Sequence, residues 1–281
     1  MKSLYDISAP AKLNLFLHIT GRRNDGYHLL QSVFMLIDWC DTLHFDLRAD
    51  GSISREDLST PLPAEDLIVR AAHALKAVGN CPLGAHIGIE KNIPAQAGMG
   101  GGSSDAASTL LALNRLWKLN YPLEKLITIG LQLGADVPFF LNGLNAWVEG
   151  IGEHITPVYL PPASFLVVKP NQGLETKLIF SDPLLKRDSD AATMHDFAAD
   201  AFGFGQNDLQ DVAKRLCPEM NDALSWLASQ GLNGRMTGSG SAVFAQVLQP
   251  IDLKNTPDVF KIKRCNNLIT HPLEGWAIKE R

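Results

Sequence analysis

The fold of this chain is decided by one glycine-rich stretch, Pro94-Ala-Gln-Ala-Gly-Met-Gly-Gly-Gly-Ser-Ser104. An alternating pattern at 85–90 predicts a strand before it, and an apolar pattern at 104–117 predicts a helix after it. The closely spaced glycines let the backbone approach a ligand. Consecutive N–H groups at a helix N-terminus, where the helix dipole is positive, form a site for an anion. The stretch therefore predicts a phosphate-binding loop; the alternative is a flexible loop that only turns the chain.

The loop differs from two common nucleotide-binding patterns. It lacks the Gly-x-x-x-x-Gly-Lys-Ser/Thr pattern of P-loop NTPases and the Gly-x-Gly-x-x-Gly pattern of dinucleotide-binding folds. Its two serines, Ser103 and Ser104, can cap the following helix, bond a phosphate oxygen or face a metal ion. The loop therefore predicts phosphate binding of a different type.

The composition indicates a folded protein with a modest negative charge. The chain has 281 residues, 46% apolar and 20% charged, which is too apolar for disorder and long enough for about two domains. The net charge of −5 argues against a dedicated nucleic-acid binder. No apolar run approaches the ~18 residues of a membrane span, and the N-terminus lacks a signal-peptide pattern, so we expect a cytoplasmic protein. The cysteines and histidines show no metal-ligand spacing, and we expect reduced thiols.

Strand and helix patterns alternate irregularly along the chain, which predicts an α+β fold. A half-buried strand is expected at 7–20, because apolar and polar residues alternate there. A loop-rich stretch after 146 suggests two domains, 1–155 and 156–281. The basic stretch 254–264 is expected to be a solvated face. The other predicted elements are an extended stretch at 31–48, helices at 65–79, 123–133, 206–216 and 219–230, and strands at 165–168 and 242–248.

Four polar or aromatic residues outside the loop are candidates for chemistry. Asp136 lies between a helix stop at Gly134 and Pro138, so it is a candidate base; the alternative is helix capping or turn chemistry. Lys12 lies on an apolar strand, where an edge or surface lysine is the alternative. Tyr27 and His28 follow a turn and suit a nucleobase, although a tyrosine packed on its own domain is equally ordinary.

Three motifs together resemble the GHMP kinase family. They are Pro10-Ala-Lys-Leu-Asn-Leu-Phe-Leu17, the glycine-rich loop extended to Ala107, and Thr237-Gly-Ser-Gly-Ser241, in the order the family has them. Two further motifs, Gly21-Arg-Arg-Asn-Asp-Gly-Tyr-His28 and Leu133-Gly-Ala-Asp-Val-Pro138, resemble the branch that acts on diphosphocytidyl-methylerythritol. The resemblance implies a two-domain fold, with a ribosomal S5 domain 2-like N-terminal domain and a ferredoxin-like C-terminal domain. It also implies ATP-dependent phosphorylation of that substrate's 2-hydroxyl in isoprenoid precursor synthesis.

The resemblance also implies roles for individual residues. Lys12 and Asp136 would form the catalytic pair, with Lys12 keeping the carboxylate ionised. The residues implied to bind ATP are Lys91, Pro94, Ala95, Gln96, Ala97, Gly98, Met99, Gly100, Gly101, Gly102, Ser103 and Ser104. The residues implied to bind the acceptor are Asn14, Tyr27, His28, Thr176 and Phe180, with the cytosine held between Tyr27 and Phe180.

The sequence departs from the family pattern at a few positions. Met99 stands where leucine is usual, a near-isosteric change. Asp105 stands where asparagine is common and adds a negative charge near the phosphates. Asp66 replaces an asparagine at the expected adenosine pocket, which Lys91 also flanks. Mg²⁺ is expected with few protein ligands, Ser104 being one candidate.

Two alternative functions differ from this one in class or acceptor. The first is a kinase of the same family that acts on mevalonate, homoserine or a sugar. The second is a non-catalytic module that binds nucleotides or RNA, which the acidic charge and the presence of both Lys12 and Asp136 disfavour. We expect a small-molecule substrate, no nucleic-acid or membrane partner, and a monomer or weak homodimer.

Overall fold

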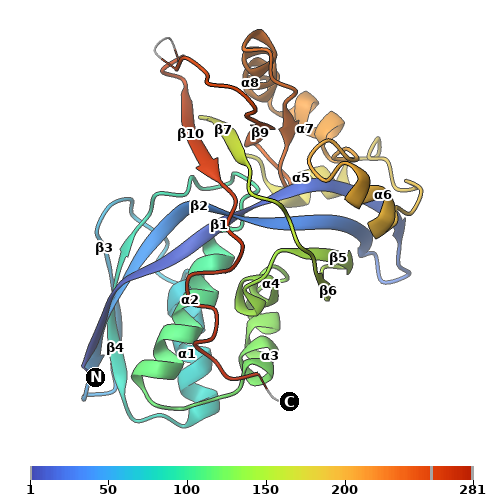
Figure 1. The fold of residues 1–281 in the computed structure, drawn as a ribbon. Coiled ribbons are helices and arrows are strands. Elements are labelled where there is room, and N and C mark those ends of the chain that lie inside the picture. Colours follow the sequence, from blue (N-terminus) through green and yellow to red (C-terminus); the bar gives the residue numbers. More distant parts are fainter. Residues whose placement is uncertain (1, 254–255, 280–281) are drawn as a thin grey trace.

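A computed structural model describes residues 2–253 and 256–279. The chain forms two parts, each with its own β-sheet, and helices pack against both sheets (Figure 1). This arrangement confirms the predicted α+β class. Within the described residues, no helix is both long and apolar enough to cross a membrane.

The first sheet is built around two long strands that pair along almost their whole length. β1 (Ser3–Arg22) and β2 (His28–Arg48) run antiparallel and are joined by a short turn. β1 pairs with β2, and the order across the rest of the sheet is β3-β4-β2-β5-β6. The shorter strands are β3 (Ile53–Asp57), β4 (Gly84–Glu90), β5 (Ala146–Gly150) and β6 (His154–Pro157). The strands predicted at 7–20, 31–48 and 85–90 are confirmed, with β1 longer than expected.

Four helices cover one face of the first sheet (Figure 1). They are α1 (Leu67–Gly79), α2 (Gly101–Leu116), α3 (Leu123–Leu133) and α4 (Val137–Asn142). Asp66 begins α1, because its side chain accepts a hydrogen bond from the Val69 N–H, and Asn80 ends the helix in the left-handed conformation. α2 begins at Gly101, earlier than the predicted 104, because the last glycines of the loop form its first turn.

The second part has a four-stranded sheet with the order β10-β7-β9-β8. Its strands are β7 (Ser164–Pro170), β8 (Arg235–Met236), β9 (Val243–Gln246) and β10 (Phe260–Asn266). Its helices are α5 (Thr176–Ser181), α6 (Met194–Ala199), α7 (Gln210–Leu216) and α8 (Pro218–Ser229). Met220, Ala223 and Leu227 of α8 are buried in the core beneath this sheet. The helix predicted at 206–216 begins later, and the one at 219–230 is confirmed within a residue at each end.

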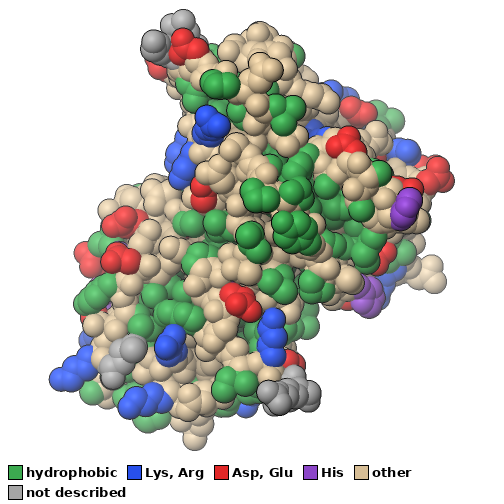
Figure 2. Space-filling view, in the orientation of Figure 1, with side chains coloured by type: hydrophobic (Ala, Val, Ile, Leu, Met, Phe, Trp, Pro, Cys, Tyr) green, Lys and Arg blue, Asp and Glu red, His purple; other side chains and the backbone are tan. Residues whose placement is uncertain are grey.

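β1 is buried on both faces where the two parts meet, so the predicted half-buried strand is wrong there. Leu13 and Leu15 are buried, and so is Phe16 on the face expected to be polar. These residues share one core cluster with Phe165 and Phe244 of the second sheet. On the face shown in Figure 2, hydrophobic side chains gather over the middle of the molecule. The second part therefore covers a face of β1 that a local sequence pattern assigns to solvent.

The solvated face expected at 254–264 is confirmed for Lys261 and Arg264, which are exposed, but the strand that carries them also has an apolar side. β10 pairs with β7 along its length, and Phe260 and Ile262 pack against the core of the second part. Residues 254 and 255 lie outside the described residues. After β10 the chain returns to the first part, where Leu273 and Ala277 join the core beneath the first sheet. The domain boundary expected between 155 and 156 stays a prediction.

Candidate active site

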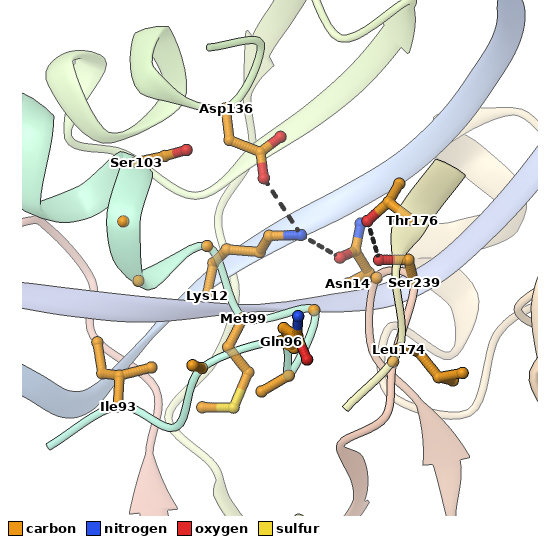
Figure 3. Close-up of a pocket in the computed structure, with 18 of the residues that line it drawn as sticks. Lys12, Asn14, Ile93, Gln96, Met99, Ser103, Asp136, Leu174, Thr176 and Ser239 are labelled. Carbon is orange, nitrogen blue, oxygen red and sulfur yellow. Dashed lines mark hydrogen bonds and ion pairs between the residues drawn. The ribbon is translucent and has the colours of Figure 1, made fainter. Parts of the chain in front are cut away.

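A cleft of about 840 Å³ is lined by both parts of the chain, a size typical of small-molecule sites. Its walls come from β1, the glycine-rich loop, the start of α2 and Asp136 in the first part. The second part contributes α5 and the turn at 238–240. Figure 3 shows side chains from these segments facing one another. Residues 94–103, which the sequence assigned to ATP, all line this cleft.

The glycine-rich loop is shaped by its contact with a second glycine-rich turn. Gly98 and Gly100 have φ values of 70° and 71°, which glycine adopts without strain. A Cβ on Gly98 would lie 2.8 Å from the nitrogen of Gly240 and closer still to the carbonyl oxygen of Thr237. A Cβ on Gly238 would lie 3.0 Å from the Cα of Gly98. The two turns therefore pack backbone against backbone, and only glycine fits at this contact.

α2 presents its N-terminus to the cleft. Gly100 precedes the helix in the left-handed conformation, and no side chain caps it. Gly101, Gly102 and Ser103 line the cleft with the first turn, whose N–H groups have no partner within the helix. Ser104 does not line the cleft; its hydroxyl is buried with no hydrogen-bond partner in the described residues. The arrangement suits the phosphate groups of a nucleotide, and Ser103 is the serine positioned to face them.

Lys12 and Asp136 meet in this cleft. The Nζ atom of Lys12 lies 3.6 Å from Oδ2 of Asp136 and also donates to Oδ1 of Asn14 (Figure 3). Only 5% of the Lys12 side chain is exposed, so the alternative of a surface lysine is wrong. Burial lowers the pKa of Lys12, and the charge of Asp136 opposes that shift. The backbone of Lys12 also donates to the carbonyl oxygen of Met99, which ties β1 to the glycine-rich loop.

Asp136 stands immediately before α4, but its side chain makes no capping hydrogen bond to that helix. The helix-capping alternative is therefore wrong. Gly134 ends α3, and Pro138 lies in the first turn of α4, so Asp136 sits in a short link between two helices. Its side chain is 31% exposed and faces Lys12. A carboxylate held in this way is available to a hydroxyl group in the cleft.

Asn14 is held on several sides. Its Nδ2 donates to the Ser32 hydroxyl at 2.9 Å, while its Oδ1 accepts from Lys12. Its backbone N–H donates to the Thr237 hydroxyl at 2.9 Å. Asn14 lines the cleft, and its side chain holds the Lys12 amino group in place.

The structure brings together two of the three expected nucleobase residues. The rings of His28 and Phe180 lie 5.1 Å apart at an interplanar angle of 36°. Arg187 donates from Nε to Nε2 of His28 at 3.0 Å, and burial followed by the charges of Arg187 and Arg22 lowers the pKa of His28. Tyr27 is 60% exposed, and neither Tyr27 nor His28 lines the cleft itself. Phe180 does line it.

Thr176 begins α5 at the rim of the cleft. Its hydroxyl lies 2.7 Å from that of Ser239, which belongs to the second glycine-rich turn (Figure 3). Both residues line the cleft. The contact joins α5 to the turn that packs against the glycine-rich loop, so two walls of the cleft are connected.

The two residues expected at the adenosine pocket make strong contacts within the protein. The amino group of Lys91 contacts the carboxylates of Asp41 and Asp105. Burial raises the pKa of Asp105, and the charge of Lys91 opposes that rise. The Asp66 carboxylate caps α1 and lies 2.9 Å from an Nη1 atom of Arg55. The carboxyl group of Asp105 is therefore held by a lysine within the protein.

Sequence reasoning missed Ser239, which lines the cleft, and two residues that hold expected site residues without lining it, Asp41 and Arg187. Ser239 lies within a quoted motif and could have been found there. Asp41 and Arg187 carried no such signal, because their partners Lys91 and His28 lie 50 and 159 residues away. Among residues 2–253 and 256–279, no group of three or more His, Cys, Asp or Glu side chains is placed to hold a metal ion.

Two family models match the chain. One, described as the GHMP kinases N terminal domain, matches residues 66–144, and the other, described as GHMP kinases C terminal, matches residues 186–263. Together the two models match more than half of the chain and fall in its two parts in the family's order.

Curated proteins and solved structures are also similar to the chain. A protein of Albidiferax ferrireducens named 4-diphosphocytidyl-2-C-methyl-D-erythritol kinase is 75% identical over 281 residues, covering 100% of this chain and 98% of its own length. A protein of the same name from Delftia acidovorans is 66% identical, covering 100% of this chain and 99% of its own length. A crystal structure of 4-(cytidine 5'-diphospho)-2C-methyl-D-erythritol kinase has a TM-score of 0.79 and 32% identity, covering 94% of this chain and 98% of that one.

Proposed function

The chain belongs to the GHMP kinase family, whose two-domain fold its motifs predicted, and we propose that it transfers the γ-phosphoryl group of ATP to 4-diphosphocytidyl-2-C-methyl-D-erythritol. The acceptor is the 2-hydroxyl group, and the reaction belongs to isoprenoid precursor synthesis. One observation carries the proposal: the Lys12–Asp136 pair and the uncapped N-terminus of α2 line the same cleft. The names of relatives that are 75% and 66% identical support the choice of acceptor.

The nucleotide phosphates bind at the first turn of α2. Its N–H groups and the positive end of the helix dipole offset the phosphate charge without a dedicated cation in the loop. Gly101 leaves the backbone of this turn open to the cleft, because a Cβ there would lie 3.1 Å from Cγ2 of Ile93, another cleft residue. The ATP-binding loop 94–104 therefore acts through its backbone, with Ser103 as the serine that faces the cleft.

Asp136 and Lys12 act on the acceptor hydroxyl. Phosphoryl transfer needs an in-line hydroxyl, a group that takes its proton, and positive charge near the transferring oxygens. Asp136 orients the hydroxyl and accepts the proton. Lys12 places a positive charge 3.6 Å from Oδ2 of Asp136 and, being buried, interacts with charge more strongly than it would in water. Asn14 fixes the Lys12 amino group through its Oδ1.

Mg²⁺ fits this site as an ion that arrives with the nucleotide. The Ser103 hydroxyl lines the cleft and points toward Asp136 (Figure 3), so these two residues offer oxygen ligands beside the phosphate site. When bound, the ion would neutralise charge on the phosphate oxygens. Ser104 does not line the cleft and its hydroxyl is buried, so it does not fit this role.

The cytidine group binds at the end of the cleft formed by α5. Phe180 offers an aromatic face there, and His28 lies beside it with its ring nitrogen Nε2 occupied by Arg187. Thr176 lies between this end and the phosphate loop and suits the diphosphate of the acceptor. Tyr27 would complete the sandwich from the exposed turn before β2. The cytoplasmic location and the monomer or weak homodimer stay predictions.

The first experiment measures ADP release with Mg²⁺-ATP and four acceptors. These are diphosphocytidyl-methylerythritol, mevalonate, homoserine and galactose. Turnover with the cytidyl compound alone is expected. Turnover with another acceptor would keep the phosphoryl-transfer site and contradict the roles given to His28 and Phe180. ATP binding without turnover of any acceptor would favour a binding module.

The role of Asp136 is tested by Asp136→Asn, which keeps the shape of the side chain. Turnover is expected to fall by about 10²- to 10⁴-fold, because the proton acceptor is lost, while ATP affinity stays near the wild-type value. Asp50→Asn is the matched control, since Asp50 is an exposed aspartate paired with Arg48 and does not line the cleft. Loss of ATP affinity in the Asp136 variant alone would mean that this residue shapes the nucleotide site.

A further inference from the structure

Three charged side chains from three separate segments meet at the base of the phosphate loop. Lys91 follows β4, Asp41 lies on β2, and Asp105 lies on α2. The Nζ atom of Lys91 lies 2.6 Å from Oδ2 of Asp105 and also contacts Oδ2 of Asp41. The side chains of Asp41, Asp105 and Lys91 are 0%, 3% and 11% exposed. The cluster is therefore an interior ion triad, which water screens little.

The triad joins the two ends of the loop. Oδ1 of Asp41 accepts the backbone N–H groups of Asn92 at 2.6 Å and Ile93 at 2.8 Å, directly before the loop begins at residue 94. Asp105 is the first residue after the loop ends at residue 104. Lys91 bridges these two carboxylates. The entry and the exit of the loop are thus held together through one ammonium group.

The contacts of Lys91 are sufficient to hold it in this position. Burial lowers its pKa, but the two carboxylates raise the pKa by more, so the amino group stays protonated. An ammonium group has three N–H donors, and two of them are directed at the two aspartates. Removing one member of a buried ion pair leaves an uncompensated charge, so the loss of Lys91 would disturb both aspartates.

We propose that Lys91 is a positioning residue, which fixes the spacing of the two ends of the phosphate loop through Asp41 and Asp105. The proposal rests on the proposed function in one respect, that this loop binds nucleotide phosphates. It differs from the role implied by the resemblance, in which Lys91 contacts adenosine. If Lys91 positions the loop, its loss displaces the N–H groups of α2 and weakens the binding of every phosphate ligand. If Lys91 contacts adenosine, its loss weakens only ligands that contain adenosine.

The two roles are separated by a ligand that has no adenosine. Calorimetry would measure the Kd of ATP and of inorganic tripolyphosphate for the wild type, Lys91→Met, Asp105→Asn and the double variant. We expect Lys91→Met to weaken both ligands by the same factor, about 10- to 100-fold, because a misplaced loop affects every phosphate ligand. When Asp105 has already been replaced by asparagine, we expect Lys91→Met to raise the Kd by a smaller factor than it does in the wild type. Both changes break the same contact, so their effects are not additive.

The double variant also keeps the test valid if Lys91→Met fails to fold. That single change leaves two buried carboxylates without their partner. The double variant leaves only Asp41, which keeps two backbone donors. Its Kd values are then compared with those of Asp105→Asn alone. Lys214→Met, an exposed lysine on α7, controls for the loss of a lysine elsewhere.

Each outcome bears on one of the two claims. Equal weakening of ATP and tripolyphosphate, with effects of the two changes that are less than additive, supports the positioning role. Weakening of ATP alone, or the same factor for Lys91→Met in both backgrounds, overturns it in favour of a direct contact. A wild-type protein that binds neither ligand would refute the proposed function itself.

Discussion

Replacing Gly98 by alanine is expected to separate the two glycine-rich turns and weaken nucleotide binding. The added Cβ would lie 2.8 Å from the nitrogen of Gly240, well inside the 3.4 Å at which ordinary contact begins. It would lie closer still to the carbonyl oxygen of Thr237. Both neighbours are backbone atoms, so no side-chain rotation can relieve the clash. The loop or the opposing turn must move.

The expected cost follows from two contributions. A non-glycine residue at φ 70° costs roughly 1–2 kcal/mol. Overpacking a tight contact costs about 1–3 kcal/mol more. Some of this total lowers the free energy of unfolding, and some is relieved by displacing the loop. We therefore expect the unfolding free energy to fall by about 2 kcal/mol and the Kd of ATP to rise at least about tenfold.

Gly102→Ala is the matched control within the same loop. A Cβ there would lie 3.5 Å from Cδ1 of Leu67, an ordinary contact, and Gly102 lies within α2, where alanine is the better helix former. Urea unfolding gives the stability of each variant, and calorimetry gives the Kd of ATP. If Gly98→Ala matched the wild type in both measurements, or if Gly102→Ala were the more damaging change, the backbone contact would not shape the loop.

Two further predictions concern pH. The protonated form of Lys12 is needed for turnover, and burial lowers the pKa of Lys12 from 10.5. In a plot of kcat against pH, the alkaline decrease should therefore have its midpoint below pH 10.5. A midpoint at or above pH 10.5 in a discontinuous assay would contradict this. Burial lowers the pKa of His271 from 6.5 to about 4, so only the unfolded chain takes up this proton as pH falls from 6.5. Between pH 6.5 and pH 5 this should remove about 1.6 kcal/mol of stability. Urea unfolding of His271→Asn, which keeps an acceptor near Nδ1, should show a flatter pH dependence, and an unchanged slope would rule the histidine out.

Local patterns predicted the elements whose neighbours are close in sequence. α3 matches its predicted span, because its apolar positions, its start after Pro122 and its end at Gly134 are all local signals. The phosphate loop was predicted for the same reason, since its glycines and the helix after it are contiguous. The apposition of Lys12 and Asp136 came from the family resemblance, and the structure places them 3.6 Å apart.

The features that were missed depend on distant partners. Phe16 is buried because Phe197 of α6 and Phe204 of the loop after it pack against its ring, and nothing near Phe16 in the sequence indicates those segments. The apolar side of β10 was not predicted, because its partner strand, β7, lies about a hundred residues earlier. Asp41 lies in a strand with an ordinary alternating pattern, which does not mark it as a site residue. Its ion pair with Lys91 becomes visible only in the folded structure, where Lys91 also contacts Asp105.

The return of the chain to its first part after β10 has a consequence for synthesis on the ribosome. Leu273 and Ala277 belong to the core formed by α1 to α4, and the His271 N–H donates to the carbonyl oxygen of Gly143 just after α4. A nascent chain therefore cannot complete the core of its first part until residues 271–278 have been made. The apolar faces of α1 to α4 therefore stay partly exposed to solvent while the second part is translated. Truncation within this segment would expose them to chaperones and proteases rather than merely shorten the second part.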